Sequence, residues 1–82
     1  MKDEHRDNKR LIDSVRSTAD RRELIRQCAL DDINTQILLL RHTEFKSFDY
    51  IADTIGLSLS QVCRRYRYAT QILSDVIRDM RQ

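Results

Sequence analysis

The apolar residues of the C-terminal half follow the spacing of two consecutive helices. Ile51, Ala52 and Ile55 lie on one face of the first helix. Gly56, the single glycine of the chain, follows them and can adopt the positive φ that a helix end often requires. Ser58 is a good N-cap, because its hydroxyl can accept a hydrogen bond from a free amide of the next turn. The pattern therefore predicts a helix, a tight turn at Gly56 and a second helix after Ser58.

The second helix is expected to be long, because its apolar stripe continues to Met80. The stripe alternates spacings of 4 and 3 residues, which makes a seven-residue repeat. A helix-turn-helix by itself needs apolar residues only to about Leu73, so the rest of the stripe requires another partner. Tyr66 belongs to the inward side and is expected to pack in the core rather than to stack on bases. The stripe consists of Val62, Tyr66, Ala69, Leu73, Val76 and Met80.

The N-terminal residues also have helical composition, but their apolar stripe changes direction. On a helical wheel one apolar set lies roughly 90–180° from the other, with Ser17, Thr18 and Asp20 near the change of direction. The first set is Leu11, Ile12, Val15 and Ala19, and the second is Leu24, Ile25 and Cys28. Asp20 and Glu23 have the spacing of a capping box. We therefore expect one helix near 4–17 and another near 21–29. A single long helix that contacts two different partners is the alternative.

The apolar residues near the two ends of the chain are the expected partners of one another. They could meet within one chain or between two copies, and the seven-residue repeat favours a homodimer. The expected dimer surface consists of Leu11, Ile12, Val15, Val76, Ile77 and Met80.

A central helix is expected to begin at Asp31 or Asp32, whose carboxylates suit its positive N-terminal end. Its apolar residues cover nearly three sides, which indicates a helix touched by several others. Ser47 is expected to cap the next helix, with Asp49 in its first turn. The apolar residues of the central helix are Ile33, Ile37, Leu38, Leu39 and Leu40.

Composition favours one all-α domain. The chain has 82 residues, of which 40% are hydrophobic, with no proline and one glycine. We expect a small bundle of four to five helices that contains a helix-turn-helix with a long C-terminal recognition helix. Residues 1–29 are assigned to packing or dimerisation, and residues 30–82 to the helix-turn-helix unit. No apolar run approaches the ~18 residues of a membrane span and the start is charged, so we expect no membrane partner and a cytoplasmic location.

The sequence offers no signal for a metal, a cofactor or catalysis. His5 and His42 are distant in sequence from each other and from both cysteines, and no Cys-x-x-Cys or His-x-x-x-His pair occurs. A Gly-rich phosphate loop and a Gly-x-Ser-x-Gly motif are also absent. We therefore expect no enzyme, no metal, no cofactor and no small-molecule ligand. Cys28 and Cys63 are expected to be half-buried thiols in a reducing compartment rather than a disulfide.

The net charge of +2 hides an uneven distribution. Residues 30–55 carry two basic and five acidic side chains (−3), whereas residues 56–82 carry five basic and two acidic side chains (+3). Three arginines and no acidic residue lie between Gly56 and Ser74. A helix that faces phosphates needs positive charge without nearby carboxylates. This segment is therefore the expected nucleic-acid-facing element, and a merely solvated arginine-rich face is the alternative.

About half of the chain follows a spaced motif without gaps. The motif reads Leu30, ILLLRH at 37–42, SFDYIADTIGLSLSQV at 47–62, and then Arg65, Ala69 and Leu73. It resembles region 4 of bacterial sigma-70-type factors, the helix-turn-helix that binds the −35 promoter element. The chain departs from the family at Cys63, where a basic residue is usual, and at Tyr66, where leucine or a small residue is usual.

The resemblance implies sequence-specific binding of double-stranded DNA and transcriptional regulation. The 82 residues leave no room for the sigma regions that bind core polymerase and melt the −10 element. We therefore expect a short stand-alone sigma-like regulator of phage or mobile-element type. The alternatives are a protein-interaction module that docks on RNA polymerase or an anti-sigma-like partner, and a DNA-positioning subunit in phage packaging or recombination. The acidic residues offered to a basic protein partner are Asp31, Asp32, Glu44, Asp49 and Asp53.

The outward positions near the start of the second helix are the expected DNA contacts. The residues expected to read base edges are Ser60, Gln61 and Arg64, because Gln can pair with adenine and Arg with guanine. The residues expected to bind phosphates are Lys46, Ser47, Ser58, Arg65, Arg67 and Tyr68, with Ser58 acting through its backbone amide.

Overall fold

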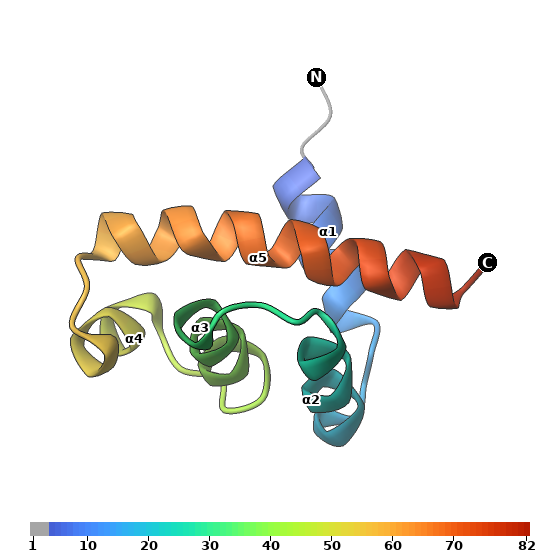
Figure 1. Ribbon diagram of the computed structural model, residues 1–82, viewed down its shortest axis with the longest axis horizontal. Helices are drawn as coiled ribbons and strands as arrows, with labels where there is room; N and C mark the ends of the chain where they lie inside the picture. Colours follow the sequence, from blue (N-terminus) through green and yellow to red (C-terminus); the bar gives the residue numbers. More distant parts are fainter. Residues whose placement is uncertain (1–3) are drawn as a thin grey trace.

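The longest helix, α5 (Leu59–Met80), runs along one side of the molecule, and the other helices pack against it (Figure 1). In this computed structural model the backbone is described for residues 4–82 and the side chains for residues 6–82. The described residues form five α-helices and no strand, so the prediction of an all-α bundle with a long C-terminal helix is confirmed. The four helices before α5 are α1 (Glu4–Asp13), α2 (Thr18–Gln27), α3 (Asp32–His42) and α4 (Phe48–Ile55).

Short polar side chains fix where four of these helices begin. Each capping residue has an extended backbone, and its side-chain oxygen accepts a hydrogen bond from the backbone amide three residues later. The distances from nitrogen to oxygen are 2.8–3.2 Å. The predicted caps of the central helix and of both later helices are therefore confirmed. The capping residues are Ser17, Asp31, Ser47 and Ser58.

The break between the two N-terminal helices is confirmed, but the predicted boundaries are wrong. Helix α1 ends at Asp13 rather than near residue 17, and α2 begins at Thr18 rather than near residue 21. Asp20 and Glu23 do not form the predicted capping box, because the hydroxyl of Ser17 accepts the bond from the Asp20 amide at 3.2 Å. The cap therefore lies three residues before the position that the sequence pattern suggested.

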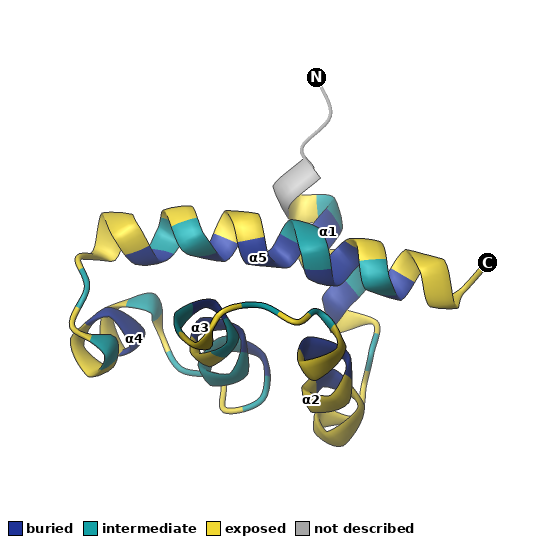
Figure 2. Cartoon of the chain, viewed as in Figure 1, coloured by how far each residue is buried: buried dark blue, intermediate teal, exposed yellow. Residues whose placement is uncertain are grey.

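One apolar core lies under α5, and every helix contributes buried residues to it. The inward residues of α5 from Val62 to Leu73 are buried as predicted, whereas the opposite side is exposed (Figure 2). Beyond Leu73 the stripe packs against α1 of the same chain. The N-terminal segment and the helix-turn-helix unit therefore share one core, whose buried residues are Ile12, Leu24, Ile25, Ile37, Leu38, Ile51, Ala52, Val62, Tyr66, Ala69, Leu73 and Ile77.

This packing corrects the dimer surface expected from the sequence. Ile12 and Ile77 are buried inside the chain at 1% and 2% exposure, so a second copy has no access to them. Leu11, Val15 and Val76 are half-buried against the same core. Of the six expected interface residues, Met80 alone is exposed. The reason is that α1 crosses α5 and covers the second half of its stripe (Figure 1).

A polar contact ties α1 to α5 at this crossing. Asn8 is buried, and its amide group donates to Oε1 of Gln71 at 2.9 Å. Its carbonyl oxygen accepts a hydrogen bond from Arg78 at 3.2 Å. A buried amide that uses both its donor and its acceptor across an interface fixes one relative position of the two helices.

A buried arginine closes the ends of two helices. The guanidinium of Arg21 donates from Nε to the carbonyl of Val15 (2.6 Å), from Nη1 to that of His42 (3.0 Å) and from Nη2 to that of Asp13 (3.3 Å). The last carbonyls of a helix have no intrahelical partner, so these bonds satisfy the ends of α1 and α3. The guanidinium also lies 5.8 Å from the ring centre of Phe45.

We expect Arg21→Met to lower the free energy of unfolding by roughly 3 kcal/mol, because it leaves three carbonyls without their charged donor. Arg22→Met on the same helix is the matched control; Arg22 is exposed, and its replacement should change stability by less than about 0.5 kcal/mol. Urea denaturation of both variants measures the difference. Equal losses in the two variants would show that the buried guanidinium contributes nothing of its own.

Candidate nucleic-acid interface

The turn between α4 and α5 has the geometry that the single glycine suggested. Gly56 adopts φ +83° and ψ 34°, and the amides of Gly56 and Leu57 both donate to the carbonyl of Ala52, at 2.9 and 3.0 Å. This pair of bonds ends α4 and sends the chain sharply into α5 (Figure 1). A Cβ atom at position 56 would have no neighbour within 4 Å, so the backbone conformation alone requires glycine.

The first turn of α5 is a capping box. The backbone amide of Gln61 donates to Oγ of Ser58 at 3.1 Å, and the amide of Ser58 donates to Oε1 of Gln61 at 2.9 Å. The Ser58 amide, which the sequence assigned to a phosphate, is therefore already bonded. The side chain of Gln61 keeps only its NH₂ group for a base. The amides left without a partner in this turn are those of Leu59 and Ser60.

Several of the predicted DNA contacts lie together on the outer side of α5. Ser60, Arg64 and Arg67 are exposed and follow one another at i, i+4 and i+7, so they lie along one face. Neither arginine forms an ion pair with another described residue. Tyr68 is 60% exposed on the same outer side of the helix. The structure thus brings these four residues to one accessible surface.

Arg65 lies apart from that group, because it contacts the start of α3. Its Nη1 donates to Oδ1 of Asn34 at 3.3 Å and lies 3.7 Å from Oδ2 of Asp31. The expectation of arginines without a nearby carboxylate is therefore wrong at this position, since Asp31 is distant in sequence and close in space. A guanidinium that already has an acidic partner is less available to a phosphate.

Lys46 and Ser47 lie at the start of α4, as expected, but both have partners. Nζ of Lys46 lies 4.9 Å from the ring centre of Tyr50, and the hydroxyl of Ser47 caps α4. Arg41, which the sequence analysis missed, donates to the carbonyl of Lys46 at 3.0 Å and lies over the ring of Phe48. Arg41 thereby holds the segment between α3 and α4 in place.

A second residue missed by the sequence analysis is Leu59, the first residue of α5. Its side chain is 46% exposed at the end of the helix that carries Ser60 and Arg64. Its place directly after the N-cap was the signal that could have identified it, because the first turn is the part of a recognition helix that reaches base edges.

A buried aromatic cluster supports α5 from below. Tyr66 is 2% exposed, its hydroxyl lies 2.8 Å from Nε2 of His42, and its ring meets that of Phe48 edge-on with centres 4.8 Å apart. The core role predicted for Tyr66 is therefore confirmed. Burial lowers the pKa of His42 to about 4 and raises the pKa of Tyr66 to about 12, so both groups are neutral near pH 7.

Other kinds of site find little support among the described residues. No group of three or more His, Cys, Asp or Glu side chains there is placed to hold a metal ion. Cys28 and Cys63 are free and half-buried, as expected, and burial raises the pKa of the Cys28 thiol. No helix in this part of the chain has the length and apolar character needed to cross a membrane.

Comparison of the chain with protein-family models, with curated proteins and with solved structures found no match.

Gly56→Ala should lower the free energy of unfolding by about 1–2 kcal/mol, the cost of an L-residue in the left-handed region, because no side-chain clash adds to it. Gly56→Asn should cost less, since asparagine adopts this conformation more readily. Chemical denaturation compares the two. An alanine variant as stable as the parent would mean that the turn relaxes to negative φ.

The low pKa of His42 should make stability fall as the solution is acidified. Between pH 6.5 and about 4 the unfolded chain binds a proton at this residue that the folded chain does not, so the free energy of unfolding decreases with decreasing pH. The loss across this window should be roughly 3 kcal/mol. Unfolding curves of the parent and of His42→Gln measure it, because other groups titrate equally in both. Parallel pH profiles of the two proteins would contradict the assignment.

Proposed function

We propose that this protein is a sequence-specific DNA-binding transcriptional regulator that places the first turns of α5 in the major groove. The observation that carries the proposal is the exposed line of Ser60, Arg64 and Arg67 at the start of a helix that follows a sharp, glycine-defined turn. A helix presented in this way can reach base edges with its first turns, while the preceding helix crosses the phosphate backbone.

The contacts available on this surface suggest a role for each group. Arg64 reaches base edges and pairs with guanine, and the NH₂ group of Gln61 donates to an acceptor on a neighbouring base. Arg67 binds a phosphate, as do the unpartnered amides of Leu59 and Ser60, which lie at the positive end of the helix dipole. Tyr68 and Lys46 add phosphate contacts at the edges of this surface. Ser47 and Arg65 mainly stabilise the fold.

This assignment agrees with the resemblance to region 4 of sigma-70-type factors and favours a short sigma-like regulator that acts in the cytoplasm. The capped turn supports the likeness in geometry, because the motif residues from Ser47 to Val62 form α4, the turn and the start of α5. A DNA-positioning subunit for packaging or recombination would use the same surface, and the function of neighbouring genes distinguishes it from a regulator.

A second function is docking on a basic protein such as a subunit of RNA polymerase or an anti-sigma-like partner. The observation that favours it is acidic surface on the part of the chain from α3 to α4, where every member of the expected acidic set is exposed. Its members are Asp31, Asp32, Glu44, Asp49 and Asp53. Asp31 already lies beside Arg65, which leaves four carboxylates for such a partner.

Selection from random double-stranded DNA with the purified protein, followed by titrations over a range of salt concentrations, tests the proposal. Recovery of one enriched site supports DNA reading. Failure to enrich any sequence at low salt, together with capture of RNA polymerase, would favour the docking function instead.

On the selected site, Arg64→Ala should weaken binding by about 1–3 kcal/mol and relax the preference at one base pair. Arg67→Ala should weaken binding to all sequences and reduce the salt dependence by about one phosphate contact. Arg22→Ala is the matched control, because Arg22 is an exposed arginine on α2 at the other end of the molecule. The base-reading role of Arg64 is refuted if the Arg64 and Arg22 variants bind the site equally well.

A further inference from the structure

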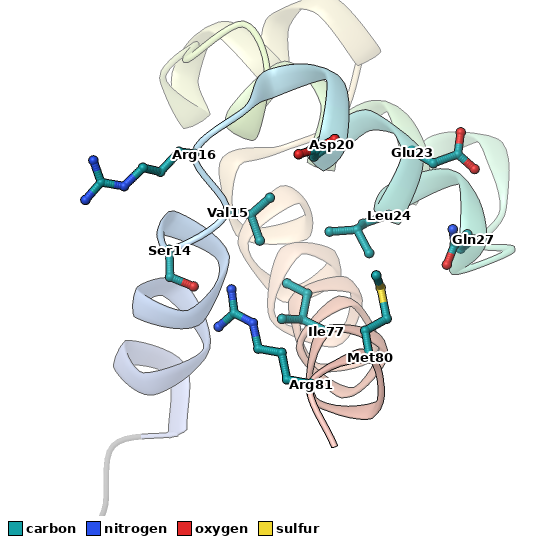
Figure 3. A pocket seen from close by; sticks show the side chains of 10 residues that line it. All are labelled: Ser14, Val15, Arg16, Asp20, Glu23, Leu24, Gln27, Ile77, Met80 and Arg81. Atoms are coloured by element: carbon teal, nitrogen blue, oxygen red, sulfur yellow. The ribbon is translucent and has the colours of Figure 1, made fainter.

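A groove of about 410 Å³ lies at the end of the molecule farthest from the turn between α4 and α5 (Figures 1 and 3). The connection between α1 and α2, helix α2 and the last turn of α5 form its walls. Figure 3 shows four apolar side chains that point toward one another at its centre: Val15, Leu24, Ile77 and Met80.

Met80 is the unusual member of this group, because it is 62% exposed although it continues the buried stripe of α5. The groove beside it is apolar at its centre, and no other part of the described chain covers it. Because burial of a methionine side chain is favourable, a second surface that covers this edge stabilises the molecule.

The charges around the groove are arranged as two opposite rims. Asp20 and Glu23 lie on the α2 side, whereas Arg81 comes from the end of α5 and Arg16 from the connection between α1 and α2, with its side chain directed outward (Figure 3). Asp20, Arg16 and Arg81 form no ion pair with another described residue, and the ion pair of Glu23 is with Arg26 of its own helix, at 3.6 Å. A surface with one acidic and one basic rim is complementary to its own copy after a twofold rotation. A uniformly acidic or basic partner would meet repulsion on one side.

We infer that this groove is the interface of a homodimer, in which the exposed side of Met80 in each chain packs against the groove surface of the other. The acidic rim of one chain then faces the basic rim of its partner, twice by symmetry. This interface differs from the surface expected from the sequence, because Leu11, Ile12 and Val76 serve the fold of one chain. Half-buried Val15 and exposed Met80 remain accessible in the groove, whereas Leu24 and Ile77 are buried and form its floor. The charged residues of α2 are added at its edge.

The position of the groove also predicts the arrangement of the DNA site, a consequence that rests on the proposed function. Helix α5 has 22 residues and is therefore about 33 Å long. The interface lies at its C-terminal end and the exposed line of Ser60, Arg64 and Arg67 near its other end. A twofold dimer joined at the groove presents two such lines in opposite orientation, so the preferred DNA is an inverted repeat with half-sites about one helical turn, or a multiple of it, apart.

The mass of the purified protein in solution, measured by sedimentation equilibrium, tests the interface without DNA. The parent should be a dimer, and Met80→Glu should weaken dimerisation at least about tenfold, because it puts a carboxylate in an apolar groove. Leu59→Gln is the matched control: it changes an exposed apolar residue at the other end of the same helix and should leave the mass unchanged.

A charge exchange tests the pairing of the rims. One variant carries Arg16→Glu with Arg81→Glu, and the other carries Asp20→Lys with Glu23→Lys. Each alone should be monomeric, because its rims repel those of its copy, whereas an equimolar mixture should form mixed dimers. Helix content by circular dichroism verifies folding; if either pair prevents folding, the Met80→Glu result decides.

The outcomes separate this inference from the proposed function. A parent that stays monomeric at high concentration, or a Met80→Glu variant that dimerises like the parent, overturns the interface even if single half-sites bind. Conversely, a groove-dependent dimer that enriches no DNA sequence supports the interface and overturns the proposed function. A dimer that selects only single, unpaired sites overturns the predicted arrangement of half-sites.

Discussion

Helix α5 has one apolar stripe along most of its length, and each of the other helices buries part of it. Helices α3 and α4 cover the first half, and α1 and α2 cover the second. Because a stripe on one side of a helix leaves the other side free, the same constraint that builds the core determines which residues of α5 face solvent. Arg64 and Arg67 are exposed for this reason, and no irregularity of the helix is needed to expose them.

The features that the sequence predicted correctly are those that depend on near neighbours. A capping serine such as Ser47 or Ser58 acts on an amide three residues away, and a glycine such as Gly56 ends a helix through its own backbone conformation. The inward stripe of α5 is likewise a periodic pattern. The boundary of α2 was missed, because Ser17 and Asp20 are both good N-terminal residues and the pattern could not rank them.

The sequence could not predict contacts between residues that are distant along the chain. The bond between His42 and Tyr66 joins α3 to α5, and Asp31 approaches Arg65 across a still longer separation in sequence. Nothing in the local pattern around His42 indicates a buried imidazole, because its polar character suggests an exposed helix end. For the candidate site, this meant that exposure of Arg64 and Arg67 could be predicted from helical periodicity, whereas the loss of Arg65 to an acidic neighbour could not.

The capping box of α5 also separates the residues that stabilise the helix start from those proposed to contact DNA. Ser58 and Gln61 satisfy each other, so the start of the helix is stable before any ligand arrives. Recognition then falls to groups that do not hold the fold together, among them Arg64, Arg67 and the first-turn amides. A surface separated from the core in this way can change its side chains without loss of the helix beneath them.

The three bonds of Arg21 have a consequence for how the chain comes apart. One side chain on α2 holds carbonyls that belong to α1, to the connection after it and to the last residue of α3. Separation of α1 and α2 from the remaining helices breaks these bonds together with the shared core. The boundary near residue 30 therefore marks a change in sequence pattern, whereas the folding unit extends across it, and the whole chain should open as one cooperative body.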